Sequence, residues 1–125
     1  MDYQNYAMGK WVSGDGDGTP LFNAITGTEI GSANSKGLDF GQMMNYSREI
    51  GSPALRKMTF QQRGLMLKAL ALHLHGIKGK FYELSAATGA TKIDSWIDIE
   101  GGIGNLFANA SLRKQFPDLP YYVDG

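Results

Sequence analysis

Residues 88–104 read TGATKIDSWIDIEGGIG, and this stretch decides the fold because two helical patterns meet in it. The first pattern ends at Thr88–Gly89, since glycine takes the left-handed conformation that a helix end often needs. The second pattern begins after Thr91. We therefore expect two long helices, over residues 59–87 and 92–110, that are joined at Gly89.

The first helical pattern opens with a capping box. The hydroxyl of Thr59 can cap the first turn, and Gln62 can reach back to the backbone N–H of Thr59. Apolar residues then recur at intervals of three or four, which is the spacing of a buried helix face. The predicted buried stripe consists of Met66, Leu70, Leu74, Ile77, Phe81 and Leu84, and Leu67 widens it.

The second helical pattern carries glycines that an ordinary helix avoids. Asp94 can cap this helix or lie in its first turn, where a carboxylate suits the helix dipole. Gly101, Gly102 and Gly104 each cost roughly 1 kcal/mol relative to alanine. Two explanations stay open: another backbone approaches the helix closely, or the helix breaks there. The predicted apolar stripe consists of Ile93, Trp96, Ile97, Ile103, Leu106, Phe107 and Ala110.

The first third of the chain predicts extended segments and a shorter helix. Residues 1–34 form an extended lead-in, in which GDGDG at residues 14–18 is interpreted as a plain turn. A calcium loop would need further oxygen ligands, and a phosphate loop would lead directly into a helix. Residues 38–50 predict a helix that is capped by Asp39 and Gln42 and is ended by the glycine and proline of residues 51–53. Its two methionines, at positions 43 and 44, are expected to fill gaps in the core.

These patterns together predict a mostly helical α+β fold in a single domain. Residues 1–34 supply short strands, and residues 35–125 supply three to four packed helices. A chain of this length buries about two-thirds of its unfolded surface when it folds.

Composition narrows the class of protein. Twelve basic and twelve acidic residues cancel, so no global charge draws the chain to nucleic acid or to an anionic membrane. No apolar run approaches the roughly 20 residues that span a bilayer, and the N-terminus lacks a signal-peptide core. We therefore expect a cytoplasmic protein with neither nucleic acid nor a membrane as partner.

A family resemblance comes from two long stretches. Residues 53–74, PALRKMTFQQRGLMLKALALHL, and residues 82–112, YELSAATGATKIDSWIDIEGGIGNLFANASL, resemble one branch of the aldehyde dehydrogenase superfamily. That branch contains the bifunctional ring-opening enzymes of bacterial phenylacetate catabolism, in which an oxepin-CoA hydrolase is joined to a semialdehyde dehydrogenase. The resemblance extends from Gly9 to Leu112 and matches only the beginning of that family's much longer chain.

The resemblance implies an oxidoreductase whose chemistry lies elsewhere. Members of the family oxidise an aldehyde through a cysteine thiohemiacetal, pass a hydride to NAD or NADP and use a glutamate to activate water. This sequence contains no cysteine and cannot perform that step. We therefore expect an N-terminal fragment, inactive by itself, with no catalytic, cofactor-binding or metal-binding residue of its own. The remainder of the dehydrogenase domain is its expected partner.

One role in the family's chemistry falls within this chain. The family handles coenzyme A thioesters, whose phosphates need basic partners, and residues 51–92 hold seven basic side chains against one acid. By the resemblance, Lys68 helps to guide the CoA moiety, with Arg63 and Arg56 as weaker candidates. Arg63 and Lys68 lie about 140° apart on an ideal helix. The alternative is a solvated basic face.

Other side chains that could carry chemistry have plainer explanations. His73 and His75 are two residues apart on a helix, so they face different directions and cannot chelate one metal ion together. Asp94, Asp98 and Glu100 form a small acidic group, for which a solvated face or a helix cap is the simpler interpretation.

A second function class competes with the dehydrogenase fragment. The chain could be a stand-alone helical module that binds a partner protein, or its own copy, through an apolar face. The PDLPYYVDG end has no helix cap and no charged tail, and we take it to indicate a cut chain. Under either interpretation, an uncovered apolar patch favours self-association.

Overall fold

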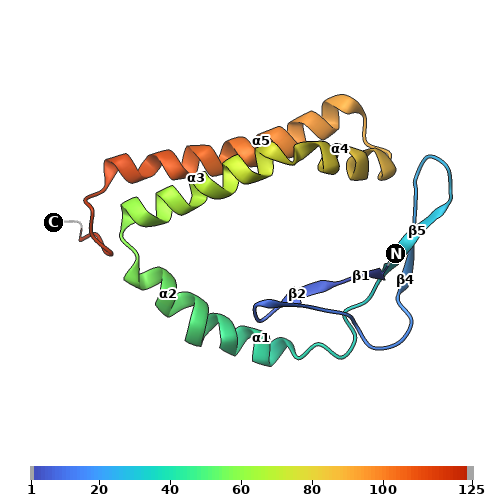
Figure 1. Cartoon of the computed structure of the whole chain (residues 1–125), viewed down its shortest axis with the longest axis horizontal. Coiled ribbons are helices and arrows are strands. Elements are labelled where there is room, and N and C mark those ends of the chain that lie inside the picture. The colour runs from blue at the N-terminus through green and yellow to red at the C-terminus, as the bar shows by residue number, and fades with distance from the viewer. Residues whose placement is uncertain (1, 124–125) are drawn as a thin grey trace. The chain divides into compact units, whose positions relative to one another are not determined.

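The computed structural model describes residues 2–123, in two compact units, Met1–Pro53 and Ala54–Gly125. The first unit contains β1 (Asp2–Tyr3), β2 (Asn5–Ala7), β3 (Lys10–Val12), β4 (Thr19–Phe22), β5 (Glu29–Ala33), α1 (Phe40–Tyr46) and the π-helical turn η1 (Ser47–Gly51). The helix α2 (Ser52–Lys57) leads into the second unit, which contains α3 (Phe60–Gly76), α4 (Lys78–Ala87), α5 (Lys92–Ser111) and the 3-10 turn η2 (Leu112–Gln115) (Figure 1).

The strands form two small sheets. β5 is the centre of a three-stranded sheet and pairs parallel with β1 and antiparallel with β4. β2 and β3 form a hairpin whose turn residues Met8 and Gly9 both have positive φ, 51° and 81°, as a two-residue hairpin turn of the favoured twist requires. Tyr6 and Trp11 face each other across this hairpin, with ring centroids 5.1 Å apart.

The short helix after the strands is longer than predicted. The Asp39 side chain accepts a hydrogen bond from the backbone N–H of Gln42, as expected for the cap. The prediction that the helix ends at residues 51–53 is wrong, because η1 and α2 continue it to Lys57. Pro53 is the second residue of α2, directly after the π-helical turn, and does not end the helical segment.

The apolar side chains of this helical segment are not covered. Phe40, Met44 and Ile50 are exposed, and Met43 is half-buried. The expectation that both methionines fill gaps in the core is therefore wrong for Met44.

Two predicted helix starts and one predicted stop are confirmed. The Thr59 hydroxyl accepts from the backbone N–H of Gln62, and the Gln62 side chain accepts from the backbone N–H of Thr59, which completes the capping box of α3. Thr91 caps α5 with its hydroxyl, so Asp94 takes the first-turn position. Gly89, after α4, has φ 84°, the left-handed conformation that the sequence predicted.

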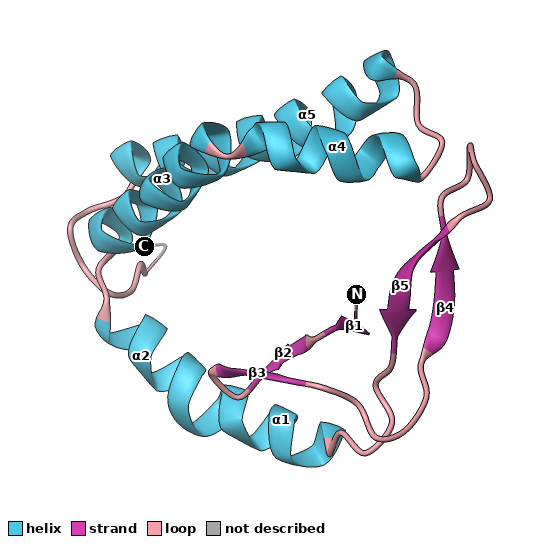
Figure 2. Cartoon of the chain, turned by 45° about the vertical axis from the view of Figure 1, so that its right-hand side comes forward, coloured by secondary structure: helices cyan, strands magenta, loops and turns pink. Residues whose placement is uncertain are grey.

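α5 packs antiparallel along both preceding helices. The single pattern predicted over residues 59–87 is divided at Ile77, where φ −110° and ψ 10° are not helical. α3 contacts the second half of α5 and α4 contacts the first half (Figure 2). Counting α1, η1 and α2 as one segment, four helical segments follow the strands, which confirms the mostly helical α+β fold.

The buried residues of α3 and α5 are small, except for Ile103. Gly64 and Ala71 are the buried residues of α3, and Ser95, Ile103 and Ala110 are those of α5. A Cβ atom on Gly64 would lie 2.9 Å from the carbonyl oxygen of Ala110, which shows how closely the helices approach.

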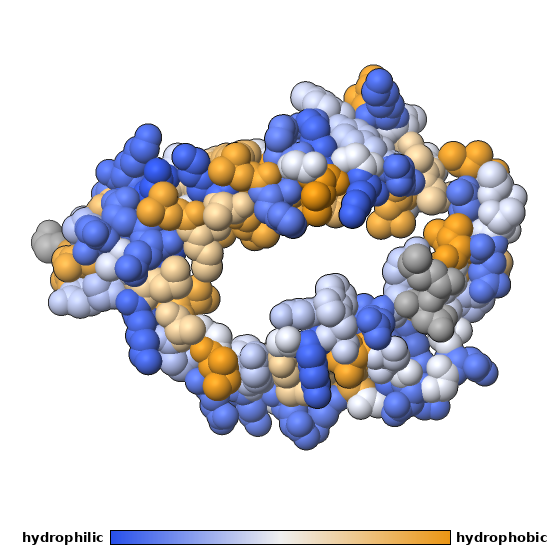
Figure 3. All heavy atoms as spheres, viewed as in Figure 1, coloured by the Kyte–Doolittle hydropathy of each residue, from blue (hydrophilic) through white to orange (hydrophobic). Residues whose placement is uncertain are grey.

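The predicted buried stripe of α3 and α4 is therefore wrong in part. Leu74, Ile77 and Phe81 are half-buried, but Met66, Leu70 and Leu84 are exposed. Small residues occupy the contact between α3 and α5 because they allow the two helices to approach most closely. Large hydrophobic side chains are left on the surface, where they form the orange areas of Figure 3.

α5 runs unbroken through its three glycines. Added Cβ atoms at Gly101, Gly102 and Gly104 would meet no atom within 4 Å among the described residues. Neither explanation from the sequence holds among the described residues, because the helix does not break and no other backbone comes close to the three glycines. None of the described helices is long and apolar enough to cross a membrane.

Candidate functional site

A polar cluster fastens α4 to α5. The Lys78 ammonium lies 2.6 Å from Oε1 of Glu100, and the Tyr82 hydroxyl donates to the same oxygen at 3.3 Å. The sequence brings these groups together because Lys78 and Tyr82 are one helical turn apart on α4. Glu100 reaches them from the antiparallel α5.

Electrostatics keep this cluster in its charged form. The hydrogen bond from Lys78 lowers the pKa of Glu100 below its usual 4.5, against the opposing effect of burial. Burial raises the pKa of Tyr82 above its usual 10.0, and the neighbouring carboxylate adds to this. A carboxylate held ionised by a lysine is a poor proton acceptor at neutral pH, so the arrangement suits a structural tie better than acid–base catalysis.

The rest of the acidic group is also structural. Asp94 accepts a hydrogen bond of 2.6 Å from the Thr91 hydroxyl at the start of α5, and Asp98 is exposed. Asp94 therefore lies in the first turn of α5, beside the capping residue Thr91, and is not itself the cap. His73 and His75 are exposed in the last turn of α3, and no group of three or more possible metal ligands occurs in residues 2–123.

A mostly apolar cavity of about 410 Å³ lies beside the cluster. Ser85 of α4 and Ser95 of α5 share a hydrogen bond of 2.8 Å at this contact. The cavity is lined by Tyr82, Ala86, Ala90, Lys92 and Ser95. These five lining residues do not pair a nucleophile with a base.

Lys68 lies at a small basic pocket at the other end of α5. This basic pocket, of about 180 Å³, is lined by Lys68, Phe107, Ala110, Ser111, Arg113 and Lys114. The Arg113 guanidinium donates to the carbonyl oxygen of Ala110 at 2.7 Å, so its position is fixed by α5 itself. No acidic residue lines the pocket, which leaves three cations around one cavity.

The other two predicted guiding residues lie elsewhere. Arg63 donates to the carbonyl oxygen of Pro120 at 3.1 Å and lies 4.4 Å from the centre of the Phe60 ring. Arg56 is exposed in the last turn of α2. The sequence reasoning missed Arg113 and Lys114, although the adjacent pair directly after the predicted helix was a visible signal.

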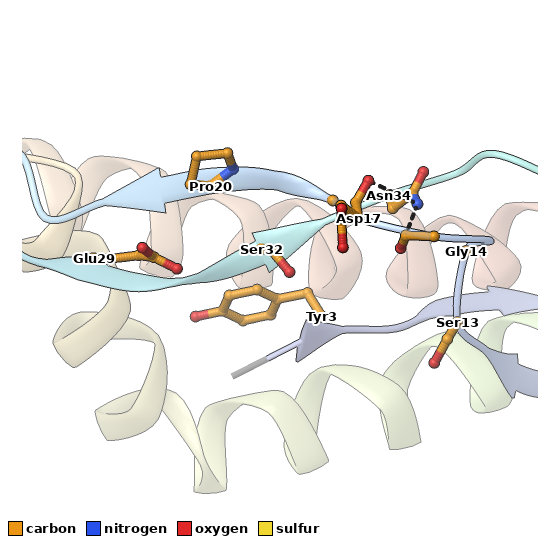
Figure 4. Close-up of a pocket in the computed structure, with 10 residues that line it drawn as sticks. Tyr3, Ser13, Gly14, Asp17, Pro20, Glu29, Ser32 and Asn34 are labelled. Atoms are coloured by element: carbon orange, nitrogen blue, oxygen red, sulfur yellow. Dashed lines mark hydrogen bonds between the residues drawn. The ribbon is translucent and has the colours of Figure 1, made fainter.

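A polar cavity of about 390 Å³ lies in the N-terminal unit (Figure 4). The Asn34 side chain donates to the carbonyl oxygens of Asp15, Gly16 and Asp17, at 2.8, 3.3 and 3.4 Å. This clamp holds the glycine-rich bend against the end of β5. The bend leads into strand β4 and not into a helix, which agrees with the predicted plain turn.

Comparison with known proteins gives one clear similarity. Over 115 residues, 91% of this chain, the sequence is 31% identical to a 3,4-dehydroadipyl-CoA semialdehyde dehydrogenase from Aromatoleum evansii. The chain spans 22% of the length of that protein. No protein-family model matches the chain.

Proposed function

We propose that this chain is the N-terminal part of an NAD- or NADP-dependent aldehyde dehydrogenase that acts on a CoA-linked semialdehyde in phenylacetate catabolism, in the cytoplasm. The similarity to the Aromatoleum evansii dehydrogenase over 91% of the chain carries this proposal. The relative's name supports an oxidoreductase that acts on a CoA-linked semialdehyde.

The exposed apolar side chains of α3 support the proposal that this chain packs against the remainder of a larger protein. The outer side of α3 exposes Leu65, Met66, Leu70 and Leu72. A soluble monomer rarely leaves so many large apolar side chains on one element. In this proposal the remainder of the dehydrogenase domain covers them.

The chain's own residues do not fit the dehydrogenase's nucleotide cofactor. The sequence holds no cysteine nucleophile, and the glycine-rich bend runs into a strand, where no helix N-terminus could receive a phosphate. The proposal therefore gives the chain no step of the oxidation. Its role is to complete the fold around residues that the rest of the enzyme supplies, and by itself it is inactive.

The basic pocket supports the proposed role of Lys68 in guiding CoA. A cavity surrounded by Lys68, Arg113 and Lys114 attracts an anion such as a CoA phosphate, and the attraction weakens as salt screens it. Arg63 is the weaker candidate because its guanidinium is engaged by Pro120 and Phe60. Arg56 is exposed and forms no hydrogen bond or ion pair within residues 2–123.

A chimaera tests the proposed function. The segment of the Aromatoleum evansii enzyme that aligns with this chain is replaced by this chain, and oxidation of the semialdehyde is followed by the reduction of NAD or NADP. We expect an active chimaera, whereas this chain alone and the relative without the segment stay inactive. A chimaera that folds but does not oxidise the substrate would contradict the proposal.

The same chimaera tests Lys68. Lys68→Ala should raise the Michaelis constant for the CoA-linked substrate at low salt, with little change at high salt, because the lysine acts through long-range charge. Lys80→Ala, an exposed lysine of α4 that does not line the basic pocket, is the matched control. If both variants changed the Michaelis constant equally, only net charge would matter, and the proposed role of Lys68 in guiding CoA would be wrong.

A further inference from the structure

The residues that follow α5 turn back onto the start of α3. This closing segment, residues 112–123, consists of η2 and the stretch after it. The backbone N–H of Phe60, the first residue of α3, donates to the carbonyl oxygen of Leu119 at 3.0 Å. The first N–H groups of a helix have no acceptor within the helix, so the closing segment supplies one. The Phe60 ring also stacks on Phe116, with centroids 4.6 Å apart.

Gln61 of α3 ties η2 to the start of that helix. Its side-chain amide donates to the carbonyl oxygen of Arg113 at 2.7 Å and to that of Phe116 at 3.3 Å. Carbonyl groups at the end of a helical turn lack enough N–H partners within the turn, and Gln61 supplies one to each of these two. Gln61 therefore fixes the backbone at the residue that carries the Arg113 side chain.

Arg63, two residues further along α3, holds the stretch after η2. Its guanidinium donates to the carbonyl oxygen of Pro120 at 3.1 Å and lies 4.4 Å from the centre of the Phe60 ring. A guanidinium that both stacks on a ring and donates to a carbonyl group is held in one position. Arg63 does not line the basic pocket, so it acts on the closing segment and not on an anion in the pocket.

The closing segment carries two of the three cations of the basic pocket. Arg113 and Lys114 lie in η2, whereas Lys68 lies on α3. None of the four residues of η2 is buried, so burial alone does not hold this turn in place. Like charges around one cavity repel, and this repulsion favours separation of η2 from α3. The bonds from Gln61 and Arg63 oppose that separation.

We infer that Gln61 and Arg63 are positioning residues of the basic pocket. They hold the closing segment on the start of α3 and so keep Arg113 and Lys114 beside Lys68, where the three cations act on one anion. Neither positioning residue touches the anion itself. The inference rests on the proposed function only for the identity of that anion, a phosphate group of CoA, because the contacts that carry it lie within this chain.

Binding of inorganic pyrophosphate by the 125-residue chain tests this role without any dehydrogenase activity. An NMR titration at low salt follows the amide signals of the basic pocket. Gln61→Leu removes the donor at similar size and leaves the net charge unchanged, so a loss of affinity cannot come from charge. We expect binding about three- to tenfold weaker, the effect of one lost hydrogen bond. Gln115→Leu, the same change at an exposed glutamine of η2, is the matched control and should bind as the wild type does.

Hydrogen exchange in the same variants separates a local release from a general loss of stability. Gln61→Leu should speed the exchange of the Phe60 and Phe116 amides, while the amide of Ala71, at the buried centre of α3, keeps its wild-type rate. Arg63→Lys keeps the charge but lacks the planar fork that binds Pro120. It should weaken pyrophosphate binding in the same direction, and it decides the question if Gln61→Leu does not fold.

Three results would overturn the inference. The first is a wild-type chain that does not bind pyrophosphate at the basic pocket, and the second is equal binding by Gln61→Leu and Gln115→Leu. The third is faster exchange with unchanged binding, which would give Gln61 a purely structural role. The chimaera keeps the proposed function separate: an inactive chimaera contradicts the dehydrogenase assignment and does not alter these results. In an active chimaera, Gln61→Leu should raise the Michaelis constant for the CoA-linked substrate at low salt and leave the turnover number unchanged.

Discussion

Glycine has opposite roles at two positions of the helical unit. At Gly64 the missing side chain makes room for α5, because an added Cβ would lie 2.7 Å from Cβ of Arg113 and 2.9 Å from the carbonyl oxygen of Ala110. At Gly101 an added Cβ would meet no atom of the described residues within 4 Å. Position in the fold, and not residue type, decides what a substitution costs.

The two glycines predict opposite effects of the same substitution. Gly64→Ala should destabilise the chain by about 1–3 kcal/mol, because the new methyl group overpacks the α3–α5 contact. Gly101→Ala should stabilise it by about 0.5–1 kcal/mol through helix propensity. Urea unfolding measured under conditions where the chain is monomeric compares the two. A neutral or stabilising Gly64→Ala would contradict the packing described for α3 and α5.

The residue-scale features that the sequence predicted are local ones. Thr59, Gln62 and Thr91 could be assigned to helix starts because a cap needs only residues within one turn. Gly89 could be assigned to a helix end for the same reason. The basic pocket could not be assigned, because Lys68 meets Arg113 and Lys114 only after two helices have packed.

At the scale of elements, α4 depends on side-chain ties more than on a core. None of its residues is buried, and it is held to α5 by the bonds of Lys78 and Tyr82 to Glu100 and by the contact between Ser85 and Ser95. α3, by contrast, packs its buried Gly64 and Ala71 against α5. We therefore expect α4 to be the first helix to separate from α5 when heat or denaturant destabilises the helical unit.

The tie from Lys78 predicts a dependence on pH. The pKa of Glu100 is lower in the folded chain than its usual 4.5, so the stability that this group contributes is present above about pH 4.5 and is lost as the pH falls through the lower folded value. Lys78→Met should lower the melting temperature at pH 7 and should have less effect at pH 3. Lys80→Met, an exposed lysine two residues further along α4, is the control.

The outcome that would contradict this tie is a Lys78→Met chain whose loss of stability is the same at pH 7 and pH 3. Hydrogen exchange resolved by residue adds a second check, because the variant should accelerate exchange in α4 before it does so in α3.

The burial of each helix was harder to predict than its existence. Spacing predicted helical structure over the residues of α3, α4 and α5, with α3 and α4 as one helix, and it placed Met66 and Leu70 on the buried face although both are exposed. The buried face of α3 instead holds Gly64 and Ala71. Their small side chains allow α5 to pack closely along α3, and this close packing outweighs the burial of one larger side chain. Likewise, Pro53 was expected to end the short helix, but η1 and α2 continue it to Lys57.

At the scale of the whole molecule, the chain has more apolar surface than its own contacts cover. α1, α3 and α5 each expose large hydrophobic side chains, and the described residues of the helical unit include few buried ones, all small except Ile103. The similarity to the Aromatoleum evansii dehydrogenase spans 22% of that protein. Both observations are explained if further protein, such as the rest of a dehydrogenase, covers these exposed faces.

The most direct test of the central claim is the turnover number of the chimaera in which this chain replaces the aligned segment of the Aromatoleum evansii enzyme. The account predicts a value within about tenfold of the parent enzyme, a difference of about 1.4 kcal/mol in the activation barrier. The chimaera that carries Gly64→Leu, which blocks the α3–α5 contact, should fall well below it. A chimaera that is folded and monodisperse but no more active than the enzyme without the segment would contradict the account.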